Sequence, residues 1–300
     1  MSDRNLGLLL AISSAFGYGL LPVVTKGIYQ NSDLEALDLA TWRFIFTVPL
    51  IWIWVRARGI HARKDLPLSE IIRFFGLGIV FSFAALSAFF ALNYIPASLY
   101  VSILYTYPGI IAIVLWLRGK AMPPMAWFAL ALTIIGVFLM IDDWAIFQSA
   151  DFIGVAAAFF NAIIVVISFL LNERLMQGRS VIRSSALITT GALLVFLLIS
   201  LFRDLSIPQN LQTWLYILFL ALCCTVFPVV TINLAIQKIG SSSAAIVSSI
   251  EPFFGIILAV IFLSETILPL QWLGALLIIC SIYILHRSNK PIPIERIFES

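Results

Sequence analysis

Residues 74 to 117 form an apolar stretch without a single lysine, arginine, aspartate or glutamate. A helix crosses the hydrocarbon of a lipid bilayer with about 20 residues, so this stretch is too long for one crossing and long enough for two. The sequence "NYIPAS" (Asn93–Ser98) divides it, because Pro96 biases the preceding residue away from helical geometry. The stretch therefore predicts two consecutive membrane-spanning helices joined by a short turn.

The rest of the chain has the same character. Only 11% of its 300 residues are charged and its mean hydropathy is +1.07, whereas soluble domains carry about 25% charged residues. One soluble core could not hide so much apolar surface, so the predicted solvent is lipid. The net charge of +3 gives no support for a nucleic-acid partner.

Segments of spanning length recur along the whole chain, and we predict ten of them. They cover approximately residues 6–28, 37–55, 72–92, 97–117, 122–141, 152–171, 183–202, 211–236, 241–263 and 267–285. Lysine and arginine gather on the cytoplasmic side of membrane proteins. With both termini in the cytoplasm, 15 of the 18 lysines and arginines fall on that side, Arg203 alone lies outside, and two lie within spans. The sequence therefore predicts an all-α integral membrane protein with cytoplasmic N- and C-termini.

The two halves of the chain resemble each other at a spacing of 144 residues. Ala91–Pro108, "ALNYIPASLYVSILYTYP", aligns without gaps to Ala235–Pro252, "AIQKIGSSSAAIVSSIEP". Tyr107 is thereby the counterpart of Glu251. Each half holds five predicted spans, an odd number, so the second half enters the membrane from the opposite side. This inverted repeat is an architecture of many secondary transporters.

The predicted repeats cover residues 6–141 and 152–285, and residues 286–300 form a predicted cytoplasmic tail. In such proteins the solute site lies near the bilayer midplane, where helices are interrupted. Glycine and proline mark candidate interruptions, although both are also common packing residues of membrane helices. The candidate helix breaks are Gly17, Gly19, Pro22, Pro108, Pro228 and Pro252.

Apart from charges at the first two positions of a span, three charged residues fall inside predicted spans, where a charge costs about 2.5–3.5 kcal/mol on insertion scales. Lys26 either reaches the outer interface with its long side chain or contacts a solute. Arg43 presents a planar fork that suits the carboxylate of a solute or of Glu251, or it is tied to helix carbonyls. Glu251 is open to three roles, which are pairing with a cation of the chain, carrying a coupled proton, and binding a cationic solute group.

Aromatic residues on the same helices are candidates for the wall of a solute pocket. Tyr107 stands out among them because it is the repeat partner of Glu251, whereas most rings in such a chain serve packing. The complete candidate set for substrate binding is Tyr18, Lys26, Trp42, Arg43, Tyr105, Tyr107 and Glu251.

Catalytic and cofactor chemistry finds little support in the residues. Cys223, Cys224 and Cys280 lie in apolar runs without a CxxC pair, and His61 and His286 lie in basic loops. The sequence contains neither a metal-ligand cluster nor a Walker motif for ATP-driven transport. We therefore predict no enzyme activity, no metal and no cofactor, and we leave proton coupling open.

Several motifs resemble those of the drug/metabolite transporter superfamily, EamA type. The segment "AFGYGLLPVVTKGIY" resembles the family's first helix, which ends in a lysine, and "LATWRFIF" resembles its second helix, which carries an arginine. The two aligned segments and "LQWLGALLIICSIYIL" resemble the third–fourth, eighth–ninth and closing helices. The chain departs from the family pattern at Tyr18, where a tryptophan is common, and at "LRGKAMP", where a glutamate is common. The resemblance implies ten helices in two inverted EamA repeats, a central cavity, and export or exchange of small metabolites, including amino acids.

We expect a multi-pass transporter of the cell inner membrane that exports small amphipathic metabolites such as amino acids by alternating access. Arg43 and Lys26 would hold or repel anionic groups, and Glu251 would act as a pairing or protonation switch. The alternatives are an uptake carrier or exchanger for an organic cation or other nutrient, a membrane-embedded enzyme, and a structural protein that transports nothing. The expected partners are a small-molecule solute and the lipid bilayer. The sequence leaves the oligomeric state open and is compatible with a monomer.

Overall fold

The computed structural model describes residues 3–57, 67–95, 100, 103–119, 123–139, 151–263 and 268–287. These residues form helices and no strand. By length and apolar composition, six helical segments among them can cross a membrane, namely residues 3–21, 37–57, 68–88, 152–176, 181–200 and 211–248. Shorter apolar helices accompany them, so the prediction of an all-α multi-pass membrane protein is confirmed. The number of ten spans and the side of the termini stay predictions, and residues 96–98 of the predicted turn and 288–300 of the predicted tail lie outside the described residues.

The helices follow the two halves of the sequence. The first half contributes α1 (Asp3–Asn31), α2 (Ala36–Ala57), α3 (Leu68–Tyr94), α5 (Tyr107–Leu117) and α6 (Pro124–Leu139). The second half contributes α7 (Phe152–Met176), α8 (Val181–Ser200), α9 (Leu211–Ala221), the π-helical segment η3 (Leu222–Val226), α10 (Phe227–Ser248), α11 (Glu251–Leu263) and α12 (Pro269–Arg287). The run α9–η3–α10 leaves helical geometry at Gly240, whose φ of 78° favours glycine because it has no Cβ.

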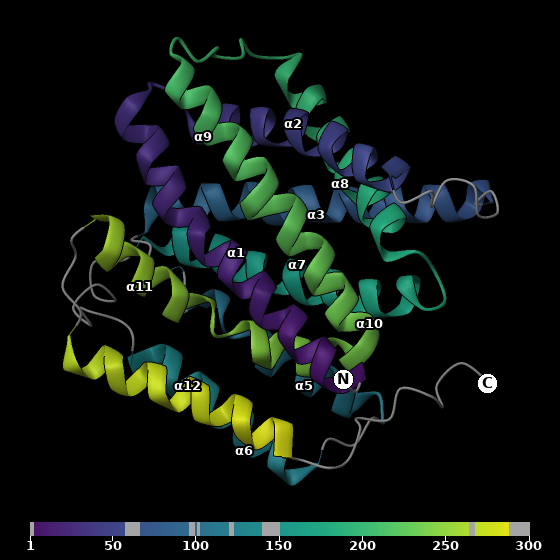
Figure 1. Ribbon diagram of the computed structural model, residues 1–300, viewed down its shortest axis with the longest axis vertical. Helices are drawn as coiled ribbons and strands as arrows, with labels where there is room; N and C mark the ends of the chain where they lie inside the picture. The colour runs from purple at the N-terminus through teal and green to yellow at the C-terminus, as the bar shows by residue number, and fades with distance from the viewer. Residues whose placement is uncertain are drawn as a thin grey trace.

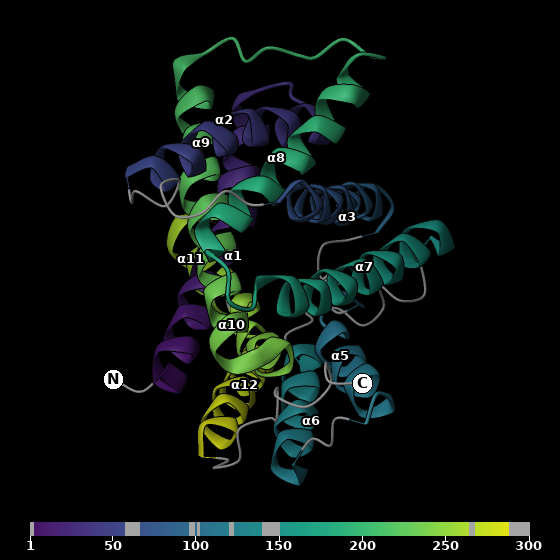
Figure 2. The same ribbon diagram turned by 90° about the vertical axis from the view of Figure 1, so that its right-hand side faces the viewer.

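The packing of one half is repeated by the other. In Figure 1, α1 crosses the molecule alongside α10, and its middle, around Gly19, packs on the start of α11. Figure 2 shows the corresponding arrangement, in which α7 packs on α3 and on α5. The helices α2 and α8 pack together, as do α6 and α12. Each helix of the first half thus has contacts that its counterpart in the second half reproduces, as two inverted repeats require.

Two turns interrupt the helical path of the chain, at equivalent points of the two halves. The turn at residues 105–106 precedes α5, and the turn at residues 249–250 precedes α11. Pro108 and Pro252 are the second residues of these helices. Proline fits this position because the first N–H groups of a helix have no acceptor within the helix in any case. Pro228 occupies the same position at the start of α10, directly after η3.

The first helix is not interrupted, which corrects one prediction. α1 runs continuously through Gly17, Gly19 and Pro22. The two glycines are contact points instead, since a Cβ at Gly17 would lie 2.9 Å from the Cys223 carbonyl oxygen and one at Gly19 would lie 2.9 Å from Phe254 Cβ. Small residues of this kind let membrane helices approach closely, and neighbouring helices make a proline such as Pro22 tolerable within a span.

Ion pairs fasten helix ends on the predicted cytoplasmic side. Lys238 lies 2.5 Å from the Asp3 carboxylate at the start of α1. Arg179, in the turn between α7 and α8, donates two hydrogen bonds of 3.0 and 2.6 Å to the Glu70 carboxylate at the start of α3. These bonds raise the pKa of the Arg179 guanidinium above its ordinary value, so the pair stays charged. Both pairs join the start of a first-half helix to a residue of the second half.

Candidate functional site

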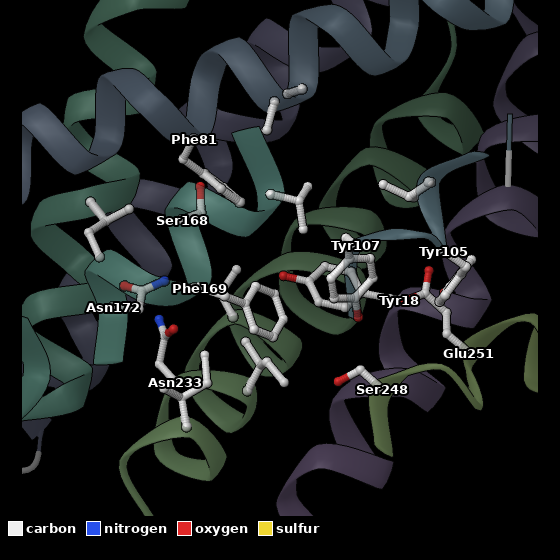
Figure 3. Close-up of a pocket in the computed structure, with 18 of the residues that line it drawn as sticks. Tyr18, Phe81, Tyr105, Tyr107, Ser168, Phe169, Asn172, Asn233, Ser248 and Glu251 are labelled. Atoms are coloured by element: carbon white, nitrogen blue, oxygen red, sulfur yellow. The ribbon is translucent and has the colours of Figure 1, made fainter. Parts of the chain in front are cut away.

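A cavity of about 240 Å³ lies between the two halves, and Figure 3 shows its lining. Its wall is built from α1, α2, α3 and the start of α5 together with α7, α8, α10 and the start of α11. Five of the seven predicted substrate-binding residues line it, and these are Tyr18, Arg43, Tyr105, Tyr107 and Glu251. The two helix starts bring Tyr107 and Glu251 to the same cavity, because each is the first residue after its turn.

Phenol rings surround the acidic end of the cavity. The Tyr105 hydroxyl lies within hydrogen-bonding reach of the Glu251 carboxylate (Figure 3). The Tyr107 ring packs 5.9 Å from the Tyr105 ring and 5.3 Å from the Phe169 ring, measured between centroids. The Tyr107 hydroxyl donates a 3.4 Å hydrogen bond to the Ala245 carbonyl oxygen at the end of α10. This end therefore offers one carboxylate inside an aromatic wall.

Arg43 is held by the π-helical segment. Its Nε donates a 2.6 Å hydrogen bond to Thr225 Oγ1, and its Nη2 donates a 3.3 Å bond to the Cys224 carbonyl oxygen. Thr225 Oγ1 in turn donates to the Leu220 carbonyl oxygen five residues earlier. Of the alternatives left open by the sequence, the tie to helix carbonyls is the one present in this structure. Arg43 and Glu251 are not paired with each other among the described ion pairs.

Tyr18 connects the two charged groups of the cavity. It lies on α1 and is close enough to both Arg43 and Glu251 to experience the charge of each. Its ring lies between the acidic end and Phe169 in Figure 3. Tyr18 therefore shares one cavity with both charged groups.

Two predicted residues are not among those seen at the cavity. Trp42 turns to the α8–α9 connection, where its Nε1 donates a 2.8 Å hydrogen bond to the Ser206 carbonyl oxygen. Its ring packs edge-on against Trp214 with the centroids 4.9 Å apart. The structure therefore does not place Trp42 at this cavity, because adjacent residues of a helix point to different faces. Lys26 belongs to α1, and its side chain lies outside the described residues.

The sequence did not single out the polar end of the cavity opposite Glu251. This end is formed by Ser168 and Asn172 on α7 and by Asn233 on α10 (Figure 3). The sequence offered one indication of this end, namely an asparagine side chain inside an apolar segment. That indication is unspecific, since Asn161 has it too and bonds the Ala84 carbonyl oxygen within the helix packing.

Unsatisfied polar atoms concentrate in this cavity. Within the described residues, four buried side-chain polar atoms have no hydrogen-bond partner, namely Ser168 Oγ, Asn172 Oδ1, Asn233 Oδ1 and Ser248 Oγ. All four residues line the cavity. Ser248 lies near the Tyr107 hydroxyl, but its own hydroxyl is without a bond of good geometry. Most buried polar groups in native proteins have partners, so this cluster marks a place that a ligand or water completes.

Comparisons with known proteins agree with this architecture. The model of the EamA-like transporter family matches the chain at residues 5–142 and again at 152–287. An uncharacterized transporter of Synechocystis sp. is 24% identical, with 95% of each chain covered. An uncharacterized transporter of Archaeoglobus fulgidus is 23% identical, with 92% of this chain and 96% of the other covered. One protein crystal structure matches with a TM-score of 0.79 at 15% identity over 94% of this chain and 96% of its own, which shows a shared fold.

Proposed function

The chain belongs to the EamA-like transporter family, and from this premise we propose that it is a secondary active transporter that exports small amphipathic metabolites, such as amino acids, by alternating access. Its family and its apolar helices make it a multi-pass membrane protein with a small-molecule substrate. The proposal adds ten spans, cytoplasmic termini and a place in the cell inner membrane. The ion pairs support this topology, because Lys238–Asp3 and Arg179–Glu70 each join segments predicted on the cytoplasmic side.

The observation that carries the proposal is the cavity at the junction of the two repeats. This cavity combines one carboxylate, one guanidinium, several aromatic rings and neutral polar atoms without hydrogen-bond partners. Its volume of about 240 Å³ is below the range of roughly 300–1,000 Å³ common for drug-sized ligands. A single molecule of about amino-acid size fits this chemistry, with its ammonium group at Glu251 and its apolar body against the rings.

Alternating access would follow from movement of one repeat against the other around this cavity. The two turns before α5 and α11 are the natural places for such movement, since neither is held by helical hydrogen bonds along its full length. The helix ends would open in alternation, and each opening would break ion pairs on one side only. The Arg179–Glu70 pair is partly exposed, so breaking it costs on the order of 1 kcal/mol.

Glu251 would bind the ammonium group and exchange it for a proton during the return step. Arg43, fixed on η3, would orient the solute carboxylate. The chain would need no metal, cofactor or catalytic step for this cycle, because the driving force comes from a gradient.

A second candidate is an uptake carrier or exchanger for an organic cation. It is favoured by one feature, namely that Glu251 is surrounded by Tyr105, Tyr107 and Tyr18 while Arg43 is bonded to η3. A carboxylate inside aromatic rings is a suitable site for a quaternary amine.

Counterflow in liposomes tests both candidates. The purified protein is reconstituted, loaded with unlabelled solute, and supplied outside with labelled amino acids or labelled quaternary amines, with and without a pH gradient. We expect amino-acid counterflow, and accumulation that depends on the pH gradient. Counterflow of quaternary amines alone would support the cation carrier, and absence of counterflow for all solutes with folded protein would contradict transport by this chamber.

A further inference from the structure

The end of the cavity opposite Glu251 is polar but carries no charge. It is formed by Ser168, Asn172 and Asn233, whereas Arg43 and Glu251 are the charged residues of the lining. In Figure 3 these three residues lie together at one side of the view, Tyr105 and Glu251 lie at the other, and Phe169 lies between. The chamber therefore has two polar ends of different chemistry, separated by rings.

The neutral end is deeply buried and incomplete. Ser168 is 8% exposed and Asn233 only 3% exposed, yet Ser168 Oγ, Asn172 Oδ1 and Asn233 Oδ1 have no partner among the described residues. A buried polar atom without a hydrogen-bond partner destabilises the folded protein. Three such atoms at one end of one cavity are a large cost to retain in a chain made mostly of apolar residues.

Asn233, one of the three side chains at this end, is held in place from the side away from the cavity. Asn233 Nδ2 donates a 2.9 Å hydrogen bond to Ser185 Oγ on α8, which leaves the opposite atom of the amide toward the cavity. Ser168 and Asn172 are four residues apart on α7, so both lie on one face of that helix. Amides and hydroxyls can both donate and accept, so together they match a group that also does both.

We propose that Ser168, Asn172 and Asn233 form a subsite for a neutral hydrogen-bonding group at the distal end of the solute. This inference rests on the proposed transport function and narrows its solute class. The solute has an ammonium group for Glu251, a short apolar or aromatic body, and a distal hydroxyl, amide or ring N–H. We expect a distal carboxylate to be rejected, because Ser168, Asn172 and Asn233 are all neutral and a buried unpaired charge is costly.

The experiment measures binding of compounds that differ only at the distal end. The probes are tyrosine and phenylalanine, tyramine and phenethylamine, and 4-carboxyphenylalanine, each titrated against the full chain in detergent. We expect the hydroxylated member of a pair to bind at least about tenfold more tightly, because a site built for a hydroxyl rejects an analogue without one. The carboxylated probe should not bind.

Ser168→Ala and Asn172→Leu are the test variants. Each should reduce the discrimination within a pair to below about threefold and should leave the thermal stability of the ligand-free protein equal or higher, since an unsatisfied polar atom is removed. Ser87→Ala is the matched control, because Ser87 is also 8% exposed but bonds Asn161 Nδ2 and does not line the cavity. The control should lower stability and keep the discrimination.

The outcomes separate the two claims. Equal binding of both members of every pair by the wild-type protein would overturn the subsite and leave the transporter proposal standing. Discrimination that survives in both test variants would do the same. Failure of the wild-type protein to bind any probe, together with absent counterflow, would overturn the transporter proposal and the subsite with it.

Discussion

Tyr107 and Glu251 begin α5 and α11, each after a two-residue turn and each before a proline. The backbone at these two points is nearly the same, but the side chains are not. Tyr107 is 5% exposed and bonds the Ala245 carbonyl oxygen, whereas Glu251 is half-buried and lines the chamber. The difference teaches that the repeat preserves the helix break, which the fold needs, and leaves the first residue of the helix free to specialise.

The surroundings of the two starts differ as well. α11 begins directly against α1, since a Cβ at Gly19 would lie 3.1 Å from the Glu251 carbonyl oxygen. On α5, a Cβ at Gly109 would meet only the tip of Ile134, at 3.4 Å. The first turn of α11 therefore packs closely on α1, whereas a methyl group at Gly109 on α5 would meet one flexible side-chain tip.

The largest expected effect comes from changing the two first residues. Glu251→Gln should reduce counterflow at least about tenfold, because hydrogen bonds to a charged group contribute about 1.5–3 kcal/mol and 1.4 kcal/mol is a factor of ten. Tyr107→Phe should change it less than about threefold, since only a long hydrogen bond is lost. Initial rates of counterflow measure both, with size-exclusion profiles as the folding control. Equal losses in the two variants would show that the asymmetry of the repeats has no functional meaning.

The second effect is on stability. Gly19→Ala should destabilise the protein by about 1–3 kcal/mol, because the added methyl overlaps atoms of the first turn of α11. Gly109→Ala is the matched control and should be neutral or slightly stabilising, since alanine is the better helix former and Ile134 can move aside. Thermal unfolding in detergent measures the stability of both variants. A smaller loss of stability for Gly19→Ala than for Gly109→Ala would contradict the close packing of α11 on α1.

The smallest expected effect concerns the π-helical segment η3. The corresponding helix of the first half, α3, has no such segment. Thr225→Val removes the hydroxyl that accepts from Arg43 and should raise the KM for solutes with a carboxylate about two- to fivefold. Thr47→Val is the control, because Thr47 is equally buried but bonds only the Arg43 carbonyl oxygen within α2. A KM that rises equally in both variants would indicate general loosening rather than a role of η3 in holding Arg43.

Much of the fold could be predicted because lipid allows few solutions. Each spanning segment must satisfy its own backbone, so apolar length alone identifies helices. The spacing of 144 residues predicted that Tyr107 and Glu251 occupy equivalent positions of the two halves, and the turns before them lie at that spacing. The prediction of helix breaks at Gly17 and Gly19 was wrong, because the sequence does not say whether a glycine interrupts its helix or lets another helix pack closely against it.

The candidate site could be predicted only in part. A charged side chain in lipid has a high free energy and is therefore rare, so Arg43 and Glu251 could be identified from the sequence. Asn172 and Asn233 cost less to bury and resemble Asn161, which serves packing. Trp42 precedes Arg43 in the chain, and only the rotation of α2 directs its ring to Ser206 rather than to the cavity.

The sequence by itself determined the solvent of this protein, its helical class, its internal repeat and the charges that must be sheltered from lipid. Those properties depend on residue type and spacing along the chain, which the bilayer selects directly. The tertiary structure alone decided which faces of the helices meet, that Arg43 is held by η3, and that three neutral polar side chains share the end of the chamber opposite Glu251. Such choices depend on how helices rotate and interlock when they pack, and no local pattern of residues records that rotation.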